Sequence, residues 1–168
     1  MPHIILIAHN LRSCHNVGSL LRTAEGLGVK KVWLTGYTPY PQAMHDTRLP
    51  HLAAKIERQI YKTALGAEKT QNWEHSTSIE DVITQLKQNG YTIVAIEQAA
   101  QSIPLPEFTS PDKVALVVGR EVEGVEPEVL ALCDQIVEIP MFGKKESFNV
   151  VQTSAMALYQ TTFTLRKA

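Results

Sequence analysis

The sequence predicts an α/β fold in which a mostly parallel β-sheet is flanked by helices. Short apolar, β-branched runs alternate along the chain with segments whose apolar residues recur at helical spacing. The run at 113–118 (KVALVV) is almost continuously apolar, as in a strand that is buried on both faces of a parallel sheet. A strand, a helix and a second strand also follow one another directly at the start, and such a unit is parallel with a right-handed crossover.

This N-terminal unit consists of a strand at 3–9 (HIILIAH), a helix from Val17 and a strand at 31–35 (KVWLT). We expect Asn16 to be the N-cap of the helix, with glycine at 26 and 28 near its end. A long loop rich in Pro, Tyr and Gly follows at 36–50. Further elements are predicted beyond it: a weaker helix at 52–64, a short strand at 73–75, and a helix that Ser78 caps and Asn89-Gly90 ends.

The second half of the chain continues the alternation. We predict strands at 91–96, 113–118 and 135–139, with a polar, Pro-containing connection at 98–111. Pro127 takes the first position of a short helix to residue 132, and an amphipathic helix follows residue 149. No repeat or linker divides the chain, so we predict one domain over residues 1–168.

Composition excludes several classes of protein. The chain has 168 residues, 44% of them hydrophobic and 20% charged, which suits a globular domain with a sizeable core. Its two cysteines are too few for a disulfide framework, and the first residues lack the basic flank of a signal peptide. No apolar run approaches the length of about 20 residues that spans a bilayer. We therefore expect a cytoplasmic protein with no membrane partner.

The net charge of -1 provides no overall attraction to nucleic acid. Six basic residues nevertheless fall in two parts of the chain that also hold candidate site residues, the N-terminal unit and the loop before the last helix: Arg12, Arg22, Lys30, Lys31, Lys144 and Lys145. They indicate either a basic patch on one face or the solvated surface that scattered Lys and Arg more often form.

Three stretches with functional residue types follow predicted strand ends, where ligands bind in open α/β sheets. In the first, residues 10–23, Asn16 lies at the start of a helix and Arg22 within its first two turns. An arginine in this place can hold a phosphate with two hydrogen bonds, lie along a reacting hydroxyl, or simply cover the helix surface.

The second stretch, residues 117–124, has Gly119 and Gly124 on either side of Glu121. Gly119 lets a ligand approach the backbone, and Glu121 can orient a hydroxyl, pair with an arginine, bind a metal, or belong to a solvated acidic turn. The spacing is that of neither a Walker A loop nor a dinucleotide-binding loop.

The third stretch, residues 139–150, places Ser147 and Asn149 just before the last helix. Their side chains can cap the first turn or point outward to hold a ligand. The histidines lack metal-ligand spacing, and Ser147 lacks the surroundings of a nucleophile elbow. We predict no metal site and no hydrolase.

Together the three stretches resemble the three motifs of the SpoU/TrmH family of RNA ribose 2′-O-methyltransferases, in the knotted SPOUT superfamily. The matching residues, in order, are Asn16, Gly18 and Arg22; Gly119, Glu121 and Gly124; and Pro140, Met141, Gly143, Ser147, Asn149 and Val150. The order and spacing of the motifs also match, over nearly the whole chain.

The resemblance implies a C-terminal trefoil knot, a homodimer, and S-adenosylmethionine bound in the knot in a bent form. The implied catalytic residues are Arg22 with Asn16, supported by Glu121, Ser147 and Asn149. The implied cofactor-binding residues are Gly119, Ile139, Pro140, Met141, Ser147, Phe148 and Asn149. Phe148 departs from the aliphatic residue that is usual between the Ser and the Asn.

Methyl transfer from a sulfonium to a ribose hydroxyl is promoted mainly by aligning oxygen, methyl and sulfur in a poorly hydrated pocket. Because an arginine stays protonated, we predict that Arg22 holds the adjacent phosphate and the developing alkoxide, and the proton acceptor is left open.

The expected partners are RNA and a second copy of the chain, with no DNA. Transfer RNA is favoured over ribosomal RNA, because a small dimer without an appended RNA-binding domain must recognise a compact fold by shape and phosphate contacts. The dimer would use the helix from Val17 and the last helix, through Val150, Val151, Ala155, Leu158 and Tyr159. Two alternatives remain: a non-catalytic RNA-binding or assembly module on the same fold, and a flavodoxin-like nucleotide-binding protein.

Overall fold

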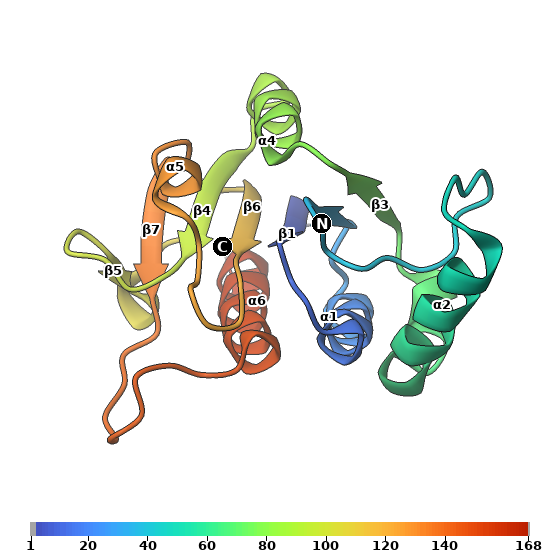
Figure 1. Cartoon of the computed structure of the whole chain (residues 1–168). Helices are drawn as coiled ribbons and strands as arrows, with labels where there is room; N and C mark the ends of the chain where they lie inside the picture. Colours follow the sequence, from blue (N-terminus) through green and yellow to red (C-terminus); the bar gives the residue numbers. More distant parts are fainter. Residues whose placement is uncertain (1–2, 168) are drawn as a thin grey trace.

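Seven parallel strands form the sheet of this computed structural model, which describes residues 3–167 (Figure 1). Their order is β3-β2-β1-β6-β4-β7-β5, and every neighbouring pair is parallel. The strands are β1 (His3–His9), β2 (Lys31–Thr35), β3 (Trp73–Ser76), β4 (Thr92–Ile96), β5 (Ile103–Pro104), β6 (Lys113–Val118) and β7 (Gln135–Glu138). The helices are α1 (Cys14–Gly26), α2 (Pro50–Ala64), α3 (Ala67–Thr70), α4 (Ile79–Gln88), α5 (Pro127–Leu130), α6 (Val150–Lys167) and the 3-10 turn η1 (Leu105–Glu107).

Helices cover both faces of the sheet because successive side chains of a strand point to opposite faces. On one face Ile4, Leu6 and Ala8 of β1 pack into a core with residues of α1, α2 and α6. On the other face Ile5 and Ile7 pack with residues of α4 and α5. Figure 1 shows α4 and α5 on one side of the strands, and α1 and α6 on the other. The predicted α/β fold is confirmed, and the trefoil knot stays a prediction.

The central strands have the predicted bounds, since their apolar runs are buried on both faces. β1, β2 and β6 coincide with the predicted ranges 3–9, 31–35 and 113–118. Ser78 caps α4 as expected, with its Oγ accepting a hydrogen bond from the Asp81 N–H (3.1 Å). None of the helices within residues 3–167 is both long and apolar enough to cross a membrane.

Helix α1 begins earlier than predicted, and this changes the role of Asn16. Ser13 is the N-cap, since its Oγ accepts from the Asn16 N–H at 3.2 Å. Asn16 therefore lies inside the first turn, and its side chain is free to contact another part of the chain.

The last helix also differs from the expected dimer surface. Val150 and Leu158 are buried in the chain's own core, with 7% and 0% of their surface exposed, whereas Tyr159 is 56% exposed. The prediction that Val150 and Leu158 contact a partner is therefore wrong, because α6 uses them against the sheet. The ring of Tyr159 packs at a tilt against that of Phe163, which is also exposed, with ring centroids 4.3 Å apart.

Candidate active site at the carboxyl ends of the strands

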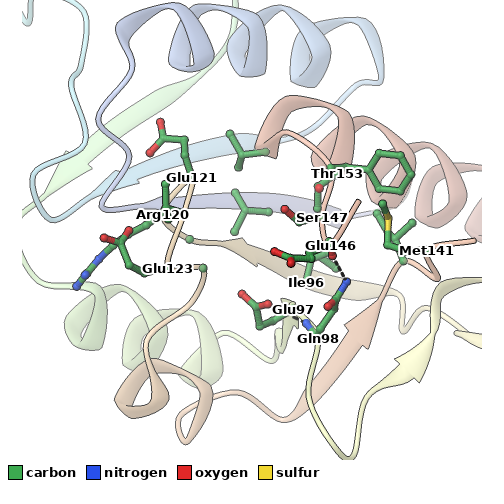
Figure 2. A pocket seen from close by; sticks show the side chains of 17 residues that line it. Ile96, Glu97, Gln98, Arg120, Glu121, Glu123, Met141, Glu146, Ser147 and Thr153 are labelled. Carbon is green, nitrogen blue, oxygen red and sulfur yellow. Dashed lines mark hydrogen bonds between the residues drawn. The ribbon is translucent and has the colours of Figure 1, made fainter. Parts of the chain in front are cut away.

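A cavity of about 260 Å³ opens where β4, β6 and β7 end (Figure 2). Its walls come from three segments: the end of β4, the loop after β6, and the loop after β7 with the start of α6. The lining residues are Ile96, Glu97, Gln98, Val118, Gly119, Arg120, Glu121, Val122, Glu123, Gly124, Ile139, Met141, Glu146, Ser147, Phe148, Val150 and Thr153. This is the edge of the sheet at which open α/β folds bind ligands.

Most of the predicted cofactor residues meet in this cavity. Gly119, Ile139, Met141, Ser147 and Phe148 all line it. Pro140 and Asn149 do not, although each is adjacent in sequence to residues that do. The second and third sequence stretches are thus brought together by the fold.

The loop after β6 is shaped by its two glycines. Arg120 and Gly124 exchange backbone hydrogen bonds of 2.9 and 3.1 Å, which close the loop on itself. A Cβ on Gly119 would lie 2.3 Å from the Gly124 carbonyl oxygen. Gly124 has φ +73°, and a Cβ there would lie 2.0 Å from Oε2 of Glu97. Both positions therefore require glycine for close approach.

Glu97 and Gln98 tie the walls of the cavity together. The Glu97 Oε2 accepts from the Val125 N–H (2.9 Å), which fixes the loop after β6. The Gln98 Nε2 donates to the Glu146 carbonyl (2.8 Å), which fixes the loop after β7 (Figure 2). The sequence analysis missed both residues, although polar side chains directly after a strand were the signal used elsewhere.

Glu121 lies at the rim and binds the start of α1. Its carboxylate accepts from the N–H groups of Arg12 (3.2 Å) and Ser13 (3.1 Å) and from the Asn16 amide (3.2 Å). Burial raises the pKa of the Glu121 carboxyl, but the hydrogen bonds that it accepts outweigh this effect, so the pKa lies below its ordinary value. An ionised Glu121 thus joins the first motif stretch to the second.

The side chain of Asn149 caps the last helix, which is one of the two roles expected for it. Its Oδ1 accepts from the Val151 N–H (2.8 Å), and its own N–H donates to Oε1 of Gln152 (3.3 Å). The Asn149 side chain thus caps the second residue of α6, and the Gln152 side chain reaches back to the Asn149 N–H as in a capping box. The side chain of Asn149 is therefore turned to the helix, whereas Ser147 points into the cavity (Figure 2).

Arg22 does not line the cavity of its own chain. It is exposed on α1, whereas Asn16 faces Glu121. Six residues of α-helix leave the two side chains about 120° apart around the axis and about 9 Å apart along it, so they point to different faces of α1. The structure brings Asn16 and Glu121 together and leaves Arg22 apart.

A buried polar network that the sequence analysis missed supports the rim. The Asn10 Nδ2 donates to Oε1 of Glu126 (2.8 Å) and also lies 3.0 Å from Nε2 of His9. Because an amide nitrogen only donates, Nε2 must accept, and the ring proton of His9 lies on Nδ1, which donates to Oγ1 of Thr35 (2.9 Å). Burial lowers the pKa of His9, which agrees with a neutral ring. Arg120 also donates to Oε1 of Glu126.

The family model described as SpoU rRNA Methylase matches residues 3–159. The chain belongs to this family. A 23S rRNA (guanosine-2′-O-)-methyltransferase, RlmB, of Neisseria meningitidis is 31% identical over 160 residues, which are 95% of this chain and 58% of the relative. The chain thus spans little more than half the length of that SpoU relative.

Two solved structures have the same fold. The Aquifex aeolicus TrmH/SpoU tRNA modifying enzyme superposes with a TM-score of 0.81 at 23% identity, over 99% of this chain and 77% of the other. The SpoU methyltransferase AviRb from Streptomyces viridochromogenes, in complex with the cofactor AdoMet, gives 0.80 at 19% identity, over 99% and 62%. Both support the parallel sheet with its flanking helices as the fold of the SpoU family.

Proposed function

We propose that the chain is an S-adenosylmethionine-dependent RNA methyltransferase that modifies a ribose 2′-hydroxyl. The observation that carries this proposal is the cavity itself. The second and third motif stretches form its walls, and Glu121 connects its rim to Asn16 of the first. Family membership supports the reaction class, because the names of the relatives describe 2′-O-methyl transfer to guanosine in RNA.

The cavity suits S-adenosylmethionine in size and in chemistry. A volume of about 260 Å³ lies just below the range of about 300–1,000 Å³ that is usual for small-molecule sites, so a folded conformer would fit it better than an extended one. Gly119 and Gly124 present backbone groups without side chains, and Ile139, Met141 and Phe148 contribute apolar contacts. When bound, the cofactor would supply an electrophilic methyl group.

The charges of the wall also suit a cation. Four glutamates line the cavity, whereas Arg120 is the one basic residue among the lining residues. The glutamates are Glu97, Glu121, Glu123 and Glu146. A sulfonium and an ammonium are attracted to such a wall, and the Ser147 hydroxyl is available to orient the ligand.

Asn16 and Glu121 would act by positioning. The ionised carboxylate of Glu121 fixes the first turn of α1 on the cavity rim, where the target ribose would enter. Its lowered pKa makes it a weaker base than an ordinary glutamate, and the proton acceptor is left open.

Arg22 would act on the cavity of a second copy of the chain. It is exposed on α1, outside its own cavity, so it is available to a partner. We propose that it lies against the cavity of the second copy in a homodimer that pairs α1 and α6. There its planar guanidinium would hold the phosphate next to the target ribose and the developing alkoxide.

Transfer RNA is the proposed substrate, and one domain over residues 1–168 would bind it as a dimer in the cytoplasm. The names of the similar proteins include both tRNA and rRNA enzymes, so the RNA must be identified by experiment. Shape and phosphate contacts would dominate recognition by such a small domain.

A non-catalytic RNA-binding module on the same fold is the second candidate. One observation favours it: the side chains of Asn16, Glu121 and Asn149 all make hydrogen bonds within the chain, as structural residues do. Incubation of the purified protein with methyl-labelled S-adenosylmethionine and total tRNA separates the two functions. We expect label in the RNA, at a ribose, as judged by protection of the neighbouring phosphodiester from alkaline cleavage. Binding of RNA without incorporation of label would support the module instead.

A further inference from the structure

Next to the cavity rim, two loops that follow neighbouring strands are joined by hydrogen bonds. The Asn10 N–H donates to the Thr35 carbonyl (3.1 Å), and the Tyr37 N–H donates to Oδ1 of Asn10 (3.2 Å). The Leu11 N–H donates to Oγ1 of Thr38 (3.0 Å). The segment after β1 and the segment after β2 therefore form one rigid edge.

Tyr37 projects from this edge with its ring uncovered. It is 53% exposed, and within residues 3–167 no aromatic ring or cation packs on its face. Tyr40 shows the contrast, since His75 stacks on it at 4.0 Å and Arg48 lies 3.6 Å from its ring centroid. Tyr37 belongs to neither of the two core clusters, so its ring is available to an external partner.

The backbone around Tyr37 is held in one conformation. Gly36 has φ +67°, and a Cβ there would lie 1.9 Å from Oδ1 of Asn10. Asn10 itself has φ 55° and is anchored through Glu126, which also binds Arg120 at the cavity wall. Left-handed backbone at a non-glycine residue is retained only where its surroundings fix it. The backbone at Tyr37 is thus fixed relative to the cavity.

Arg12 supplies a cation on the same edge. Its side chain is 66% exposed, and the contact from its guanidinium to Oε1 of Glu123 is long, at 3.4 Å. An exposed ion pair of this kind contributes little to stability, so a phosphate can replace Glu123 at low cost. The Arg12 N–H also donates to Glu121, which ties this residue to the rim.

We propose that Tyr37 and Arg12 form a contact site for an unpaired nucleotide of the RNA substrate. The base stacks on the ring of Tyr37, and the guanidinium of Arg12 holds a phosphate. Single-stranded RNA is bound in this way, by aromatic rings for the bases and cations for the backbone. The inference rests on the proposed activity on RNA and places the nucleotide beside the target ribose rather than in the cofactor cavity.

Fluorescence anisotropy with two labelled probes tests the site: a single-stranded RNA oligonucleotide of mixed sequence and a blunt RNA duplex of the same length. Tyr37→Ala should weaken single-strand binding about tenfold, the loss typical of one stacked base, without changing the salt dependence. Tyr37→Phe should recover that affinity, since the ring and not the hydroxyl stacks. Arg12→Ala should reduce the slope of log affinity against log salt by about 0.7 for the single strand.

Matched controls come from α2, where Tyr61 is 52% exposed and Arg58 is also exposed. Tyr61→Ala and Arg58→Ala should bind as the parent does. Equal single-strand affinity of parent and Tyr37→Ala would refute the contact site, even if the parent methylates RNA. An equal loss for single strand and duplex would also refute it, because stacking needs an unpaired base. If the parent protein binds neither probe, the contact site is refuted. The proposed function is refuted separately, by the absence of label in total tRNA in the methylation assay.

Discussion

Replacing Glu121 by glutamine tests whether this carboxylate positions the first helix or acts on the substrate. In the structure it accepts hydrogen bonds from the N–H groups of Arg12 and Ser13 and from the Asn16 amide. Glutamine keeps one acceptor oxygen and replaces the other by an NH₂ group, which then faces donors. We expect Glu121→Gln to lower both the stability of the fold and the rate of methyl transfer.

The size of the stability loss follows from the bonds. A hydrogen bond to a charged group contributes about 1.5–3 kcal/mol when it is buried, and Glu121 is only half-buried, so we expect a loss of about 1–2 kcal/mol. For a chain of this length that corresponds to a fall in Tm of roughly 2–8 °C. The loss should also depend on pH. Because the folded-state pKa lies below the ordinary value of 4.5, the contribution is complete above that value and disappears as the pH falls through the folded pKa.

Thermal and urea unfolding at pH 7 and at pH 3 measures this effect. Glu123→Gln is the matched control, because Glu123 lies in the same loop and has only the 3.4 Å contact to Arg12. It should change stability by less than about 0.5 kcal/mol. If Glu121→Gln lost its methyl-transfer activity while its Tm at pH 7 matched that of the parent, Glu121 would act on the substrate and the positioning role would be wrong.

Four further outcomes follow from the structure. Gly119→Ala should abolish the calorimetric signal of S-adenosylmethionine binding, because its Cβ would meet the Gly124 carbonyl, whereas Gly26→Ala, with nothing within 4 Å, should bind as the parent does. Arg22→Ala should keep cofactor affinity and lose about a hundredfold or more in single-turnover rate, with little rescue by lysine; an unchanged rate would remove Arg22 from the mechanism. Light scattering should report about twice the chain mass of 18.7 kDa, and Tyr159→Glu should shift the protein to the monomer; a parent that is monomeric would contradict the dimer. Because the folded pKa of His9 lies below its ordinary value of 6.5, stability should fall as the pH drops below about 6.5, and His9→Gln should flatten that dependence; equal slopes for parent and variant would count against a neutral buried ring.

The fold was predictable wherever burial alone determines the element. The strands at 3–9, 31–35 and 113–118 have their predicted bounds because each is a continuous apolar run between polar segments. β5 is an edge strand of the sheet and has only two residues. Two residues are too few to show a periodic pattern, so the sequence did not reveal this strand within the connection 98–111. The sequence also could not predict that β7 lies between β4 and β5, because both neighbours come before it in the chain and the insertion depends on tertiary packing.

The site was predictable as a set of loops but not as a set of contacts. Gly119, Met141 and Ser147 line the cavity as expected, because they follow β6 and β7, which lie on either side of β4 and end at the same edge of the parallel sheet. The partners of the side chains are distant in sequence: Asn10 and Glu126 are 116 residues apart, and no local pattern pairs them. Helical geometry explains the separation of Arg22 from Asn16, which the motif spacing alone did not indicate.

The distribution of charge gives the cavity and its surroundings different tasks. The four glutamates of the cavity wall outnumber its one arginine, so a phosphate is repelled from the cavity while a cationic cofactor is attracted. Under the proposed function, the backbone of the RNA would then be held by cations outside the cavity, where Arg12 and Arg22 are exposed. Only the ribose hydroxyl needs to reach the cofactor. A chain with a net charge of -1 can therefore act on RNA without a basic surface overall, because the attraction is needed at the rim alone. On this argument, neutralising Glu97 with Glu97→Gln should weaken the affinity for S-adenosylmethionine and leave the affinity for RNA unchanged, which calorimetry and anisotropy on the same preparation can measure. Weaker RNA binding by that variant would show that the two tasks are not separate.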